Sequence, residues 1–150
     1  MKNPFVPKSA VPSNSVVENS IPLHKLVDQL MTGLLPLAVD KKSFILNDVD
    51  HAFMLQADED LLAFIVGSMM SNAVSCTDSV CIRVEACINE AGIHIMVRND
   101  GSCFYSTVSN AFSHALQAAQ KLGGNISISN HKNEGTTVIF SLGAPHRIAC

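Results

Sequence analysis

Hydrophobic residues recur along this chain with two distinct spacings, and the first of these is helical. Leucine and valine positions three and four apart predict a helix over residues 22–39. Residues 59–75 are apolar on almost every side, which is typical of a buried helix, and Asp58 suits its N-cap. A third helix is predicted over residues 107–122, because a glycine pair follows as a stop signal.

The second spacing is a strict alternation of apolar and polar side chains, which is the pattern of strands with one buried face. The turns near residues 89–92 and 133–135 are rich in Asn and Gly, so each should join two antiparallel strands as a hairpin. The expected strands are residues 43–49, 80–88, 93–98, 125–130 and 136–142.

The order of these elements is helix, strand, helix, hairpin, helix, hairpin, and it predicts the fold class. Consecutive hairpins produce a mixed, mainly antiparallel sheet, and only one of its faces is apolar. The three helices should therefore cover that face, giving an α+β protein with a two-layer α/β sandwich. The strand residues expected to point at the helices are Val80, Ile82, Val84, Ile93, Ile95, Val97, Ile126, Ile128, Val138, Phe140 and Leu142.

Length and composition agree with one globular domain. The chain has 150 residues, of which 47% are hydrophobic and 15% are charged, so it can bury a sizeable core. Residues 1–15 are rich in Pro, Asn and Ser and are expected to be a flexible segment before a domain over residues 16–150. No apolar run is long enough for a membrane span and no secretory signal is visible, so a cytoplasmic location is expected.

Charge and side-chain chemistry make several functions improbable. The net charge is −3 and no basic run occurs, so the sequence carries no nucleic-acid footprint. The five cysteines form no C-x-x-C pair and are expected to be reduced thiols. The six histidines form no metal-binding constellation, so neither a zinc site nor a disulfide framework is expected.

Four short segments carry the functional information. Residues 68–77 (SMMSNAVSCT) place Asn72 on the second helix, and residues 97–103 (VRNDGSC) span the end of a strand and the loop after it. Residues 122–128 (LGGNISI) and 134–142 (EGTTVIFSL) form the last hairpin. In order, spacing and element type, these segments resemble the catalytic, ATP-binding domain of sensor histidine kinases. That domain has the Bergerat fold of the GHKL ATPase superfamily.

The resemblance implies a role for each matching residue. Asn72 falls on the asparagine that coordinates the Mg²⁺ ion bridging the nucleotide phosphates, and an amide oxygen suits a hard cation. Asn99 takes the place of the aspartate that accepts a hydrogen bond from the adenine amine. Gly101 matches the first glycine of the D-x-G-x-G motif, and the Gly135–Thr136 pair borders the pocket.

Other positions depart from the family pattern, mainly where phosphate should bind. Ser75 replaces a basic residue, and Cys103 replaces the second glycine of D-x-G-x-G. The family closes its nucleotide lid with a G-x-G-x-G turn, whereas residues 105–112 contain no glycine. No Lys or Arg occurs in residues 101–120 to replace the missing backbone donors.

The resemblance and these departures together imply a histidine-kinase-like domain with a degenerate nucleotide pocket, a pseudokinase that acts in two-component or phosphorelay signalling. It would work through protein contacts rather than catalysis, with no cofactor. Its partner would be a response regulator or a kinase, with homo-oligomers left open and with neither nucleic acid nor membrane involved.

Two alternatives stay open. The chain could be a catalytic domain that still binds ATP and magnesium, or an unrelated α/β domain that binds a small molecule. Whether it is an enzyme is therefore undecided, although the chain shows no acceptor-histidine hairpin and autokinase activity on its own is not expected.

Overall fold

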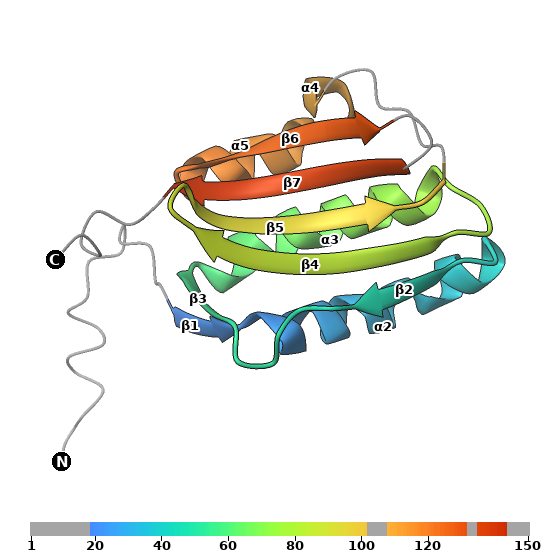
Figure 1. Cartoon of the computed structure of the whole chain (residues 1–150), viewed down its shortest axis with the longest axis horizontal. Helices are drawn as coiled ribbons and strands as arrows, with labels where there is room; N and C mark the ends of the chain where they lie inside the picture. Colours follow the sequence, from blue (N-terminus) through green and yellow to red (C-terminus); the bar gives the residue numbers. More distant parts are fainter. Residues whose placement is uncertain (1–18, 102–107, 132–134, 144–150) are drawn as a thin grey trace, which may run out of the picture.

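The computed structural model describes residues 19–101, 108–131 and 135–143, and Figure 1 shows their arrangement. The expected flexible segment, residues 1–15, lies outside the described residues. The elements in chain order are β1 (Asn19–Pro22), α2 (Leu23–Asp40), β2 (Phe44–Asn47), β3 (Met54–Ala57), α3 (Glu59–Ser75), β4 (Cys81–Asn89), β5 (Gly92–Asn99), α4 (Val108–Ala111), α5 (Ser113–Lys121), β6 (Gly124–His131) and β7 (Gly135–Gly143).

Five of the strands form the main sheet, in the order β2-β4-β5-β7-β6. The β4–β5, β5–β7 and β6–β7 pairs are antiparallel, whereas β2 pairs with β4 in parallel. A parallel neighbour needs a crossover connection, which β3 and α3 provide here. The expected mixed, mainly antiparallel sheet is therefore confirmed.

The helices cover one face of this sheet, and the core lies between the two layers. Figure 1 shows α2, α3 and α5 behind the strands, with the other face of the sheet open toward the viewer. Every strand residue that was expected to face the helices belongs to the core or packs against it. Burying one apolar face per strand is what the period-two alternation requires, so the two-layer sandwich is confirmed.

The central helix α3 matches its expected bounds. The Asp58 carboxylate accepts a hydrogen bond from the Leu61 backbone N–H at 3.0 Å, as an N-cap residue should. The α3 side chains Leu62, Ile65 and Met69 are fully buried, because α2, α5 and the sheet surround this helix.

The third predicted helix is wrong in one respect, since it consists of two shorter helices. The chain breaks at Phe112, whose backbone angles (φ −132°, ψ 35°) are not helical, and α5 starts at the next residue. Phe112 is 2% exposed, so its ring is buried in the core. The helix is interrupted at this residue. Four helices, rather than three, therefore occur in the described part of the chain.

The small antiparallel sheet of β1 and β3 was not predicted. Each strand has only four residues, which is too short for an alternating pattern to stand out from the neighbouring helices. Pro22, expected in the first turn of the helix, is the last residue of β1 and the N-cap of α2.

One expectation about cysteine is also wrong. Cys76 is disulfide-bonded, whereas Cys81 and Cys87 are free thiols. Cys103 and Cys150 lie outside the described residues. None of the helices described is long and apolar enough to cross a membrane.

Candidate functional site

Four of the five expected site residues meet where β5 ends and β7 begins. Asn99 is the last residue of β5 and is paired with Thr136, while Gly135 directly precedes Thr136. A Cβ atom on Gly135 would lie 1.9 Å from the Asn99 carbonyl oxygen, and the Gly135 φ of +87° favours glycine. Glycine is thus required here by the close approach of two backbones.

The polar side chains of this corner are engaged with the protein itself. Asn99 is 2% exposed, and its side-chain oxygen accepts a hydrogen bond from the Gly101 backbone N–H at 3.1 Å. The Thr136 hydroxyl donates to the Asn130 side-chain oxygen at 2.9 Å, across the β6–β7 pair. Both bonds hold the loop and the strand pair in place.

Asn72 lies apart from this corner, on the side of α3 that faces α4 and α5. Its amide nitrogen donates to the Ser68 carbonyl oxygen at 2.8 Å, one turn earlier. The side chain lines a cavity of about 180 Å³ that also touches the first turn of α5. The residues around that cavity are Phe64, Ser68, Asn72, Ala111, Phe112, Ser113, His114 and Ala115.

Gly101 lines a different cavity, of about 340 Å³, which shares no residue with the one at Asn72. This second cavity brings Lys41 and Asp78 next to Gly101 and Ser75. Sequence reasoning missed Lys41, because this residue lies in the α2–β2 connection and belongs to no motif. Lys41 is thus a basic residue that lines the same cavity as Ser75, the residue that replaces a basic one in the motif.

Mg²⁺ and ATP are the groups that the motif resemblance implies, and Asn72 and Asn99 are the described residues that it would bring into contact with them. Pockets for ligands of drug size usually measure about 300–1,000 Å³; the cavity at Gly101 is about 340 Å³, and the one at Asn72 is about 180 Å³. The adenine-binding oxygen expected at Asn99 is buried and already accepts a hydrogen bond.

Comparison with known proteins shows which solved structures share this fold. No protein-family model and no curated protein sequence matches the chain. The cytoplasmic segment of the histidine kinase QseC matches with a TM-score of 0.68 and 19% identity, over 94% of this chain and 89% of that one. The ATP-binding domain of PrrB from Mycobacterium tuberculosis matches with a TM-score of 0.66 and 19% identity, over 85% of this chain and 98% of that one.

A structure of full-length ShkA in complex with AMPPNP matches with a TM-score of 0.73 and 16% identity, over 89% of this chain and 33% of that one. The chain therefore has the Bergerat-type fold of histidine-kinase ATP-binding domains, as its motifs implied. The fold is not that of an unrelated α/β sandwich.

Proposed function

We propose that this chain is a histidine-kinase-like ATP-binding-type domain with a degenerate nucleotide pocket, acting in two-component or phosphorelay signalling through protein contacts rather than catalysis. The observation that carries the proposal is the hydrogen bond from the Gly101 N–H to the side-chain oxygen of the buried Asn99. The side-chain oxygen expected to recognise adenine thus already supports its own loop and lies on a residue that is 2% exposed. A response regulator or a kinase is the partner that the fold favours.

The region around the expected phosphate position supports the same proposal. The motif resemblance expects glycines at Ser109 and Ala111, and Ala111 lines the wall of the Asn72 cavity together with Phe112. A phosphate cradle depends on backbone N–H groups that a ligand can approach closely, and side chains occupy that space. The four negative charges of Mg-free ATP would then lack the donors that hold them in this fold.

Asn72 alone is a weak magnesium site. Mg²⁺ prefers octahedral coordination by oxygen, usually with carboxylates, phosphates and waters together. The bond from the Asn72 amide nitrogen to Ser68 fixes the side chain on α3, and its carboxamide has a single oxygen to offer a cation. Without a well-held triphosphate, this oxygen provides too little to retain the cation.

The second candidate function is a domain that still binds Mg-ATP, and one observation favours it. The Asn72 cavity reaches Ser113 and His114, in the first turn of α5. The N-terminus of a helix attracts anions through its unpaired N–H groups and its dipole. ShkA, which shares the fold, has been solved with AMPPNP.

A phosphotransfer assay tests the proposed lack of catalysis. The full chain is incubated with ATP labelled on the γ-phosphate, together with a purified acceptor domain of a histidine kinase and a response regulator. We expect no label on any of the three proteins, while an active histidine-kinase catalytic domain labels the same acceptor in parallel. Transfer of label that requires this chain would contradict the proposal.

A further inference from the structure

Cys76 is disulfide-bonded, whereas the other cysteines of the described residues, Cys81 and Cys87, are free thiols. The partner of Cys76 is therefore Cys103 or Cys150, the two cysteines outside the described residues. Cys76 itself is exposed and is the C-cap of α3. A disulfide breaks when a thiolate attacks one of its sulfur atoms, so exposure leaves this bond open to reductants from solution.

Cys76 also lines the Gly101 cavity of about 340 Å³. Ser75 and Cys76 form the α3 side of this cavity, Lys41 comes from the α2–β2 connection, and Gly101 comes from the loop after β5. The cavity thus depends on how the end of α3 is held against segments that are distant in the sequence. A covalent bond at Cys76 acts directly on that position.

The Lys41 side of the cavity is held by hydrogen bonds. Ser79 donates its backbone N–H to the Lys41 carbonyl oxygen at 2.9 Å, and Val80 donates its N–H to the Ser43 hydroxyl oxygen at 3.1 Å. These two bonds join the α2–β2 connection to the turn that precedes β4. Neither bond involves a sulfur atom, so this side of the cavity does not respond to reductants.

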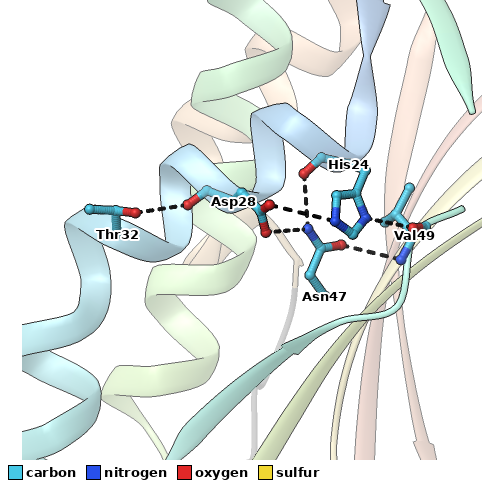
Figure 2. Close-up of polar contacts among 5 residues, drawn as sticks. All are labelled: His24, Asp28, Thr32, Asn47 and Val49. Carbon is cyan, nitrogen blue, oxygen red and sulfur yellow. Dashed lines mark hydrogen bonds and ion pairs between the residues drawn. The ribbon is translucent and has the colours of Figure 1, made fainter. Parts of the chain in front are cut away.

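The α2–β2 connection is also braced by contacts between the two elements that it joins. Figure 2 shows the Asn47 side-chain nitrogen, on β2, donating to the His24 carbonyl oxygen at 2.9 Å and to the Asp28 carboxylate at 2.8 Å, both on α2. The helix and the strand are therefore tied together, and Lys41 lies in a connection that is fixed at both ends.

The hydrogen bonds at the end of α3 are of a different kind. The Cys76 N–H donates to the Asn72 carbonyl oxygen at 3.0 Å, and the Thr77 hydroxyl donates to the Ala73 carbonyl oxygen at 2.6 Å. Both bonds join the last turn only to the turn before it, and they do not attach it to α2 or to the sheet. The disulfide supplies an attachment of the last turn to a distant part of the chain.

We propose that the Cys76 disulfide is a redox-controlled bond, which orders the end of α3 at the Gly101 cavity when oxidised and releases it when reduced. The sequence predicts a cytoplasmic location, where thiols are kept reduced and the disulfides that do form are usually transient, catalytic or redox-sensing. An exposed bond at the wall of a cavity suits that role better than permanent structural reinforcement. The proposal goes beyond the proposed function and does not rest on it.

The reductant is a dithiol, and its reaction with the bond is thiol–disulfide exchange. One thiolate of the dithiol attacks a sulfur atom of the bond, and the other cysteine of the pair leaves as a thiolate. The second thiol of the reductant then displaces the first cysteine from the mixed disulfide. The dithiol is oxidised to a disulfide, and its two protons pass to the two cysteine thiolates.

Thiol counting on the full chain tests whether the bond forms and can be reduced in the folded state. The chain has five cysteines and the bond uses two of them, so alkylation under denaturing, non-reducing conditions should modify three. Peptide mapping should join Cys76 to Cys103 or Cys150. Treatment of the folded chain with dithiothreitol before alkylation should raise the number of modified cysteines to five, with an unchanged far-UV circular dichroism spectrum. A chain in which no oxidant forms the bond would overturn the proposal, and so would a bond that is reduced only after unfolding in urea.

Hydrogen–deuterium exchange of the oxidised and reduced chain tests the effect on α3. We expect the Cys76 amide to exchange faster by about tenfold or more after reduction, because the end of the helix opens locally once it is released. The amides of Ser79 and Val80 should exchange equally in both states, since their hydrogen bonds remain.

Cys76→Ser should exchange as the reduced chain does, with or without dithiothreitol. Cys87→Ser is the matched control, because it changes an exposed free thiol on β4 and should leave the response to dithiothreitol intact. Equal exchange of the Cys76 amide in the oxidised and reduced chain would overturn the proposal, as would a response to dithiothreitol that persists in Cys76→Ser. None of these outcomes depends on whether the chain binds nucleotide.

Discussion

Gly135 illustrates how a residue that belongs to a ligand-binding motif can be required by packing alone. Its φ is +87°, and a Cβ atom there would lie 1.9 Å from the Asn99 carbonyl oxygen. The Gly-Thr pair borders the pocket in the family that the sequence resembles. In this chain, however, the pairing of β5 with β7 is sufficient to explain the glycine.

Gly135→Ala should therefore be strongly destabilising. The added methyl group meets backbone atoms that no side-chain rotation can move, and alanine disfavours a positive φ. We expect the free energy of unfolding in urea to fall by about 2–4 kcal/mol. Gly33→Ala is the matched control, because it lies in α2 with nothing within 4 Å of its Cβ position. The control should gain about 0.5–1 kcal/mol; equal effects of the two variants would refute this account of Gly135.

Residue identities in the sequence pointed to the corner of β5 and β7 but not to its hydrogen bonds. The match of Asn99 and Gly101 to the family motif indicated the end of β5, where the structure places both residues beside Gly135 and Thr136. The bond between these two residues depends on the conformation of the loop, which the sequence does not specify. Their role in ligand binding stays a prediction.

At the scale of elements, α3 has the most complete sequence signals. Asp58 caps the helix, Glu59 and Asp60 follow in its first turn, and its bounds matched the prediction. By contrast, the break between α4 and α5 depends on the burial of the Phe112 ring. Burial of this kind is a tertiary interaction, and it does not change the helical spacing of apolar residues in the sequence. The short strands β1 and β3 were missed because each needs the other as a partner.

Asp58→Ala should destabilise the protein through the end of α3. The change removes the acceptor for the Leu61 N–H and leaves that donor without its cap. We expect a loss of about 1 kcal/mol in the free energy of unfolding, measured by urea denaturation. Asp60→Ala is the control, since Asp60 lies in the same first turn without accepting the capping bond; it should lose at most about 0.5 kcal/mol. A loss at Asp60 as large as that at Asp58 would count against a specific cap.

At the scale of the whole molecule, the order of helices and hairpins was enough to predict the layers. A sheet with one apolar face can bury it only against the helices, so the sandwich follows from the patterning. The cavity that joins Lys41 to Gly101 could not be predicted in this way. It brings together the α2–β2 connection, the end of α3 and the loop after β5, which are far apart in the sequence.

The central claim about the whole molecule is that its nucleotide pocket is degenerate. A ligand that binds only the native state stabilises it by about 2.7 kcal/mol at a hundredfold excess over Kd. For a chain of this size, about 1 kcal/mol corresponds to a shift of roughly 2–4 degrees in the melting temperature. A pocket with micromolar affinity would therefore shift the melting temperature by several degrees at millimolar Mg-ATP.

The measurement that tests this claim most directly is a thermal-unfolding titration of the full chain with Mg-ATP and Mg-ADP. Asn72→Ala and Asn99→Ala are titrated in parallel, and an intact histidine-kinase ATP-binding domain serves as the positive control. The account predicts a shift near zero for this chain at millimolar nucleotide, since Asn99 is buried and Asn72 lines a cavity of only about 180 Å³. A shift of several degrees that disappears in either variant would contradict the account and assign the chain a working nucleotide site.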